Sequence, residues 1–399
     1  MDTRLVERLF LVAGLLAGCA APAPGSFKFD LDFLRKHDPG LVVLHSGDER
    51  VIVSPKYQGK VFTSTDSGDA GPSFGWIHYK AFEGAPDAHM NAYGGENRLW
   101  LGPEGGRFSL FFPPGAKMEF ANWKTPAAFD TEPWKVLGAT DTTVKLMKVM
   151  KLTNYAGHEL KITVGRMIMM WSRVGISRRL HAPLDEHVAA VGYETENILI
   201  NGGTEAWNDT TGMPCIWMLD MLKPSPSTVI VVPYQSAPGD TSKPATTDYF
   251  GEIPADRIKF AGGKIFFRAD GRSRGKLGVH PARALNVIGS YDAEHGVLTI
   301  ARFDMDTAAK YLNQEWNTMK PPFSGDAVNA YNDGPLTDGS QMGPFYELES
   351  VAPAWPLAPG SMKSYGHDVF HFTGPEASLD KISRAVLGVS IAEIKAAFQ

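Results

Sequence analysis

Residues 143–168 read TVKLMKVMKLTNYAGHELKITVGRMI, and this stretch is the most informative about the fold. Both halves are rich in aliphatic residues interspersed with lysine, and NYAG at 154–157 separates them. A turn cluster that contains Asn and Gly suits a hairpin, because these residues tolerate positive φ angles. The pattern therefore predicts a long strand from Lys145, a turn at 154–157 and a returning strand to Val164.

Short β-rich runs recur along the rest of the chain. The sequence contains 41 glycines and 28 prolines, which break it into runs without long helical stretches between them. Recurrent short strands separated by turn signals favour an all-β fold, and long antiparallel strands make a large β-sandwich the simplest architecture. The other runs lie at 41–45, 50–54, 98–101, 108–112, 228–232, 264–268, 296–303 and 345–350.

Two segments depart from this pattern and predict short peripheral helices. Residues 27–36 and 378–398 carry apolar residues at helical spacing. Because no fixed-period repeat or long linker interrupts the chain, residues 27–399 are expected to form one domain. The alternative is two domains with a boundary near residues 235–243.

The N-terminus has the pattern of an export signal. Arg4 and Arg8 precede an apolar run over 9–16, and LAGC at 16–19 resembles a bacterial lipobox. We therefore expect a signal peptide at 1–18, a lipid on Cys19 and a flexible Pro/Ala/Gly tether over 19–26. Ala20 after the cysteine favours the outer membrane. The alternative is a buried N-terminal helix.

Composition excludes several classes of function. A net charge of -5 without a basic block gives no nucleic-acid footprint. With Cys19 lipidated, Cys215 has no disulfide partner, and its apolar neighbours predict a buried, inert thiol. No G-x-S-x-G, Walker or H-E-x-x-H motif is present, so no cofactor or catalytic metal is predicted.

The stretch at 89–107, HMNAYGGENRLWLGPEGGR, is the first candidate site. Strand alternation places Arg98 and Trp100 on one face. Tryptophan beside arginine and carboxylates is suited to sugar, because the ring stacks on C–H faces and the charged groups bind hydroxyls. The alternative is a core tryptophan and a surface Arg–Glu pair. The candidate ligand-binding residues here are Asn91, Arg98, Trp100, Glu104 and Arg107, with His89 as a candidate catalytic residue.

The second candidate site is YELES at 346–350. Alternation places Glu347 and Glu349 on one face, where mutual repulsion raises at least one pKa toward the range of a general base. If that face meets water, the pair is only a solvated strand face. Tyr346, and Trp316 in the polar loop that precedes this strand, are further candidate ligand contacts. His367 and His371 share a face of the last strand, so metal ligation by the two is one possibility, and edge or loop histidines without a third ligand are the commoner alternative.

Three motifs together resemble the aldose 1-epimerase (galactose mutarotase-like) superfamily. They are GGENRLWLGPE at 94–104, LTNYAGHEL at 152–160 and the pair ELES at 347–350 with LAPG at 357–360. The resemblance, closest to an uncharacterised lipoprotein group, implies a β-supersandwich whose concave face binds sugar. It implies Glu349 as the base, Glu347 as second choice, and Arg98 as a sugar-holding arginine. The family's mid-chain histidine acid has no matching motif, and His181, His187 and His89 are the nearest replacements.

The sequence thus supports a carbohydrate-binding lipoprotein with epimerase-type acid–base chemistry. A non-catalytic glycan-binding protein using Trp100, Trp316 and Arg98 is the alternative, and a polysaccharide lyase or glycosidase is a third class. The charged residues at 248–257 and 268–276 suit either an acidic sugar or an exposed turn.

Overall fold

Three antiparallel sheets form the body of the protein. The computed structural model describes residues 21–236, 239 and 242–399, so the predicted signal peptide and Cys19 lie outside the described residues. The predicted all-β sandwich is confirmed, with strands far outnumbering helices in the described chain. No helix in that part of the chain is long and apolar enough to cross a membrane.

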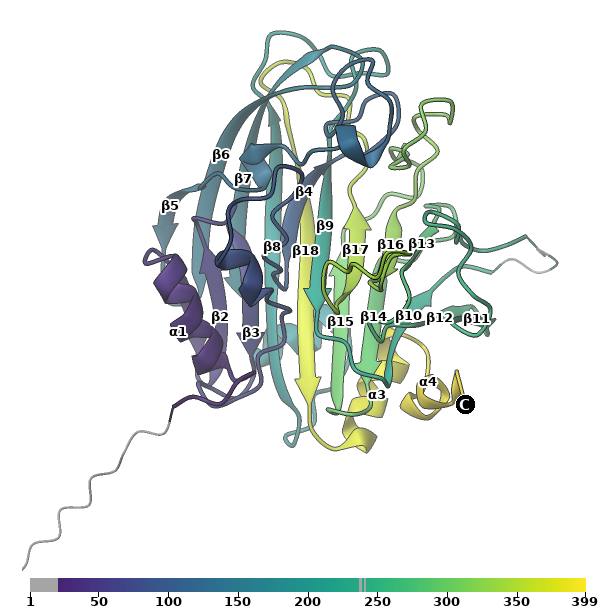
Figure 1. Cartoon of the computed structure of the whole chain (residues 1–399). Coiled ribbons are helices and arrows are strands. Elements are labelled where there is room, and N and C mark those ends of the chain that lie inside the picture. Colours follow the sequence, from purple (N-terminus) through teal and green to yellow (C-terminus); the bar gives the residue numbers. More distant parts are fainter. Residues whose placement is uncertain (1–20, 237–238, 240–241) are drawn as a thin grey trace, which may run out of the picture.

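The largest sheet has ten strands and forms one layer of the sandwich (Figure 1). The hairpin predicted at 145–164 lies in it as β6 (Thr143–Thr153) and β7 (Glu159–Met170), with Gly157 at a φ of 87° in the turn. Its strands, in spatial order, are β11 (Ile258–Ala261), β12 (Lys264–Arg268), β10 (Thr228–Pro233), β14 (Val287–Asp292), β15 (Val297–Phe303), β18 (Met362–Thr373), β8 (Ala189–Asn201), β7 (Glu159–Met170), β6 (Thr143–Thr153) and β5 (Lys135–Ala139).

A five-stranded sheet forms the facing layer and lies in front of the large sheet in Figure 1. The side chains between the two sheets form the main hydrophobic core, which includes Trp207, Met218, Leu348 and Val369. The strands, in spatial order, are β13 (Gly275–Val279), β16 (Val328–Asn332), β17 (Tyr346–Val351), β9 (Cys215–Leu222) and β4 (Arg98–Gly102).

A small sheet and the first helix close one side of the sandwich. Strands β1 (Val42–Ser46), β2 (Glu49–Ser54) and β3 (Lys60–Thr65) pair in that order, and α1 (Phe27–His37) packs beside them (Figure 1). Ser26 caps α1, its Oγ accepting from the backbone N–H of Phe29. The end of the predicted tether is therefore part of the fold, and the predicted helix at 27–36 is present.

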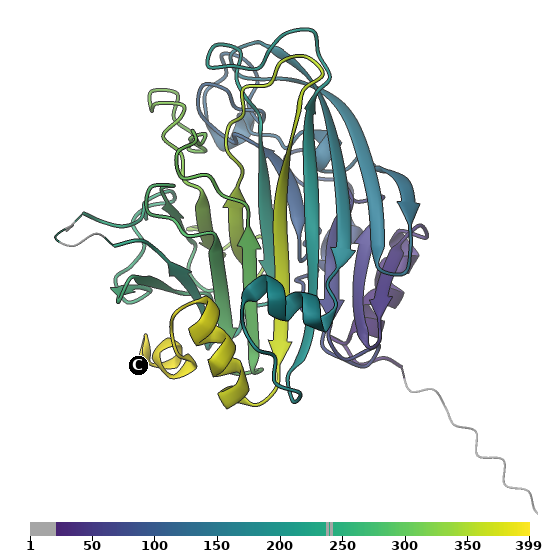
Figure 2. The ribbon, with the colours of Figure 1, turned by 180° about the vertical axis from the view of Figure 1, so that it is seen from behind.

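Short helices cover the outer face of the ten-stranded sheet, as the rear view in Figure 2 shows. They are α2 (Arg173–Leu180), α3 (Glu376–Val386) and α4 (Ile391–Ala396). The single helix predicted over 378–398 is wrong, because Gly388 adopts a φ of 67° and separates α3 from α4. The 3-10 helices η1 (Tyr79–Phe82), η2 (Phe120–Asn122) and η3 (Ala127–Phe129) lie in the loops between β3 and β5.

Candidate functional site

The outward face of the five-stranded sheet carries a row of polar side chains. Antiparallel register aligns Arg98 of β4 with Leu219 of β9, and Leu219 with Glu349 of β17. Glu349 is in turn opposite Asn329 of β16. Because side chains alternate along a strand, Glu347 and Trp100 belong to the same face. The structure thus brings the two candidate stretches of the sequence together.

Glu349 lies at the centre of this face and is fully buried. Its Oε2 accepts one hydrogen bond from the indole Nε1 of Trp217 and one from Nζ of Lys276, both at 2.9 Å. Its Oε1 is buried and has no partner among the described residues. A buried carboxylate oxygen without a partner is costly, and such atoms are rare in folded proteins. One oxygen of Glu349 is thus held in place, while the other is buried without a hydrogen-bond partner among the described residues.

Glu347 has a different partner. Its Oε1 accepts from Nη2 of Arg98 at 2.8 Å, and both side chains are almost completely buried. Burial raises the pKa of Glu347 to about 7, although the nearby Arg98 guanidinium opposes the shift; the negative charge of Glu349 adds to it. The two carboxyl groups of β17 therefore differ in electrostatic environment.

Aromatic rings hold the two cations in position. The guanidinium of Arg98 lies 4.2 Å from the ring centroid of Trp100, and Nζ of Lys276 lies 4.7 Å from that of Trp217. Trp100 and Trp217 pack edge to face at 5.6 Å. Cation–π contacts in such desolvated surroundings are stabilising. They fix Arg98 and Lys276 against the carboxylates.

The loop after β4 and the loop between β15 and β16 meet beside the polar cluster around Glu349. Nε1 of Trp316 donates to Oε1 of Glu104 at 3.1 Å, and burial raises the pKa of Glu104. The loops approach so closely that a Cβ at Gly105 would lie 2.2 Å from the carbonyl oxygen of Glu315. Trp316 stacks on Trp123 with centroids 6.0 Å apart. Glycine at 105 is therefore what lets Trp316 reach the site.

The apolar tips of nearby loops are exposed. Phe120 is 62% exposed and stacks on Trp123, Met319 is 89% exposed, and Phe250 packs edge to face on Tyr331 of β16. Singly exposed apolar residues are common, but these tips lie on loops that contact the site.

Several predicted residues lie elsewhere. Tyr346 is on the inner face of β17, turned there by alternation, and its hydroxyl forms a hydrogen bond of 2.8 Å with that of Ser290; its predicted ligand contact stays a prediction. His89 stacks on Phe120 and bonds the carbonyl of Trp123 through Nδ1, without contacting either carboxylate. Asn91 bonds Asp130, and the guanidinium of Arg107 lies over the ring of Phe108. Trp100 is buried, so its ring is not an open sugar platform.

The two histidines of β18 are interior residues. His367 Nε2 bonds Asp220 at 2.8 Å and its Nδ1 bonds Ser350 at 2.8 Å, while His371 pairs with Glu96. All of these side chains are buried between the sheets. The Ser–His–Asp arrangement resembles a hydrolytic triad, but it faces away from Glu349 and is enclosed by the core. Within the described ranges, no group of three His, Cys, Asp or Glu residues is arranged to hold a metal ion.

Sequence reasoning missed Lys276 and Trp217. Trp217 belongs to the apolar run around Cys215, which indicated only core; that thiol is indeed buried, and burial raises its pKa to about 12. Lys276 belongs to the charged residues 268–276, which suited either an acidic sugar or an exposed turn and were not connected with Glu349. The single sequence signal for Lys276 was its position in the β-rich run GKLGV at 275–279. Alternation within this run does not reveal which strand lies beside it.

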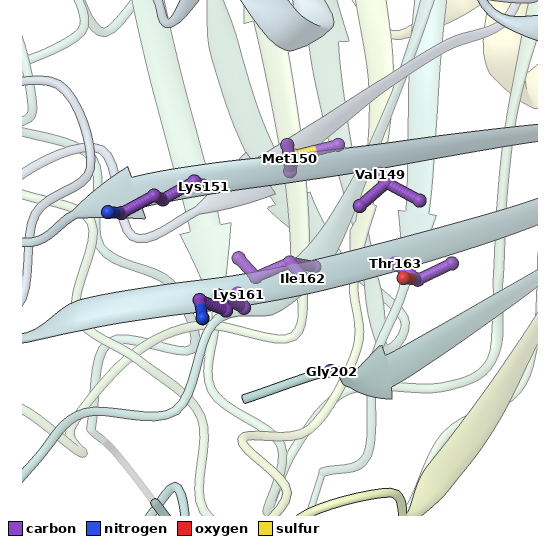
Figure 3. A pocket seen from close by; sticks show the side chains of 7 residues that line it. All are labelled: Val149, Met150, Lys151, Lys161, Ile162, Thr163 and Gly202. Carbon is purple, nitrogen blue, oxygen red and sulfur yellow. The ribbon is translucent and has the colours of Figure 1, made fainter. Parts of the chain in front are cut away.

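The hollow in Figure 3 does not coincide with the polar cluster around Glu349. It has a volume of about 300 Å³ and is lined by residues of β6 and β7 together with Gly202. Its charged groups are Lys151 and Lys161, without a carboxylate. Because acid–base chemistry needs a donor and an acceptor of protons, the polar face around Glu349 is the better candidate.

Comparisons with known proteins agree with this architecture. The fold is similar to that of a putative aldose 1-epimerase from Escherichia coli K12, with a TM-score of 0.50 and 12% identity over 83% of this chain and 98% of the other. A protein from Synechocystis sp. PCC 6803 has a TM-score of 0.50 and 13% identity over 84% and 96% of the two chains. A galactose mutarotase-like protein from Lactobacillus casei has a TM-score of 0.48 and 10% identity, over 83% and 100%.

At these identities the likeness concerns the fold alone. No curated protein matches the chain in sequence. Residues 25–398 match the model of a family of unknown function, DUF6786. The chain therefore belongs to DUF6786, and its fold is that of the aldose 1-epimerase and galactose mutarotase-like proteins.

Proposed function

We propose that this protein binds a sugar over the outward face of the five-stranded sheet, and that Glu349 removes a proton from it. The observation that carries the proposal is the buried, unpartnered Oε1 of Glu349 beside an Oε2 fixed by Trp217 and Lys276. A second buried atom of the same face, Nε of Arg98, also has no partner among the described residues. A polar ligand that bonded both atoms would satisfy them.

Acid and base are assigned from their surroundings. Oε2 of Glu349 accepts hydrogen bonds from Nζ of Lys276 and from the indole N–H of Trp217, and Oε1 is left to accept a proton. Burial favours the protonated form of Glu347, whose pKa is raised to about 7. Carboxyl groups whose environments differ in this way divide the roles of base and acid. Glu347 thus takes the part of the histidine that is missing from the sequence.

The reaction follows from these roles. Glu349 accepts the proton of the anomeric hydroxyl, and the electrons of that O–H bond form the carbonyl as the ring C–O bond breaks. The ring oxygen takes the proton of Glu347. Reclosure on the other face of the carbonyl returns both protons and gives the other anomer.

The test is proton NMR of residues 26–399 with neutral, amino and acidic sugars, reading saturation transfer and anomeric exchange together. Exchange is expected to accelerate, and E349Q should reduce its rate by about 10²–10⁴-fold, the usual contribution of a general base. E294Q is the matched control, because Glu294 is exposed and its side chain has no described partner. Full exchange in folded E349Q would reject the role of Glu349.

A non-catalytic sugar-binding protein is the second candidate. It is favoured by the ion pairs that already engage both carboxylates, Glu347 with Arg98 and Glu349 with Lys276. In this case Trp316, which is only partly buried, is the stacking ring rather than Trp100. Saturation transfer without accelerated exchange would support this function.

A further inference from the structure

Arg274 lies immediately before β13 at the edge of the candidate site. It is two residues from Lys276, so alternation places both side chains on the face that carries Glu347. Its side chain is exposed, and its guanidinium carbon lies 3.8 Å from the ring centroid of Phe250. Its Nε donates to the hydroxyl of Tyr331 at 3.3 Å.

This arginine is held more firmly than an ordinary surface arginine. The hydroxyl of Tyr331 donates to Oδ1 of Asp333 at 2.7 Å, which fixes the phenol that bonds Arg274. The following loop packs directly on the backbone, because a Cβ at Gly334 would lie 2.4 Å from the amide nitrogen of Arg274. A guanidinium fixed in this way loses less conformational entropy when it binds a ligand.

Arg274 forms no ion pair with another described residue. Arg98 and Lys276 are each paired with a carboxylate. Asp333 is occupied by the hydroxyl of Tyr331 and by the backbone N–H of Gly343, which bonds its Oδ2. Among the described residues, no carboxylate lies within ion-pair distance of Arg274. Its two terminal nitrogens thus remain free to bond a planar or tetrahedral anion.

We propose that Arg274 binds an anionic substituent of the sugar, so that the ligand is an acidic saccharide. This inference rests on the proposed function. Two residues along a strand span about 7 Å, so Arg274 and Lys276 are separated by roughly one sugar unit. A carboxylate, a sulfate ester and a phosphate ester share the required chemistry.

The experiment compares affinities for matched sugars by titration calorimetry. Galactose and glucose are paired with galacturonate, glucuronate, glucose 6-sulfate and glucose 6-phosphate, which distinguish the three anions. Wild type should bind at least one anionic sugar about tenfold more tightly than its neutral partner, and R274Q should reduce that preference to less than about twofold. R272Q is the matched control, because Arg272 is an exposed arginine in the same loop and has no described side-chain contact.

The outcomes separate the two claims. Loss of the preference in R274Q, with R272Q like wild type, supports the role of Arg274. Equal binding of neutral and anionic sugars, or a preference that survives in folded R274Q, overturns it and leaves the proposed function intact. Absence of binding by every sugar in the panel overturns the proposed function and this inference with it.

Discussion

Glu347 and Glu349 are two residues apart on one strand, yet different neighbours surround them. Glu349 accepts from an ammonium and an indole, whereas Glu347 is paired with a guanidinium and has its pKa raised by burial. Their common face follows from alternation and was predicted. Their distinct partners were not predictable, because Lys276, Trp217 and Arg98 come from three other strands.

The raised pKa of Glu347 has a consequence for stability. The folded protein releases the Glu347 proton near pH 7 and the unfolded chain near its ordinary pKa of 4.5, so the folded state holds the extra proton between these values. Stability therefore falls as pH rises through this window. We expect the free energy of unfolding of wild type, relative to that of E347Q, to fall by about 3 kcal/mol from pH 4 to pH 8.

Urea unfolding of wild type and E347Q from pH 4 to pH 8 measures the difference between their free energies of unfolding. E294Q should show a constant difference from wild type, because the exposed Glu294 is not buried by folding. Parallel curves for E347Q and wild type would show that Glu347 titrates alike in the folded and unfolded states.

At the scale of elements, local patterns predicted some of the strands and missed others. The predicted run at 108–112 is not a strand, and β8 and β9 were not predicted. The hairpin of β6 and β7 was evident because both strands and their turn are contiguous. The break between α3 and α4 was missed because a single positive-φ glycine, Gly388, interrupts an otherwise helical spacing. Apolar periodicity alone does not show where a glycine adopts that conformation.

The close contact between the loops of Gly105 and Glu315 gives a prediction at the scale of elements. The added methyl group of G105A would meet the carbonyl oxygen of Glu315 and push the loop that carries Trp316 away from Glu104. We expect a loss of about 1–3 kcal/mol in the free energy of unfolding, the usual cost of overpacking, and weaker sugar binding.

The measurement is urea unfolding followed by tryptophan fluorescence. G138A is the control, because no atom lies within 4 Å of a Cβ at Gly138 and its φ is not positive. Wild-type stability in G105A would show that the loop accommodates the methyl group without cost.

At the scale of the whole molecule, a buried polar network joins the two large sheets. Arg166 of β7 donates to Oδ1 of Asn197, to the carbonyl of Gly59 and to Oδ1 of Asn97. Asn97 donates to Asp220, which bonds His367. Burial lowers the pKa of Arg166 to about 10. The network lies behind the candidate site and fixes the five-stranded sheet against the ten-stranded one.

We therefore expect R166M to lower the free energy of unfolding by about 3 kcal/mol, because three buried acceptors lose their donor. R178M, which replaces an exposed arginine of α2, should change the free energy of unfolding by less than about 0.5 kcal/mol. Thermal and urea unfolding monitored by circular dichroism give both values. Equal stability of R166M and wild type would show that these acceptors find other donors.

The sequence by itself determined the all-β class and the hairpin of β6 and β7, because side-chain periodicity and turn chemistry are local properties. The sandwich of the aldose 1-epimerase and galactose mutarotase-like proteins was implied by the resemblance of three motifs, not by periodicity. Tertiary structure decided the site. Glu349 bonds Lys276 and Trp217 across 73 and 132 residues of chain, and Arg98 meets Glu347 across 249. Which strands become neighbours depends on how the whole core packs, and periodicity within one strand carries no information about that.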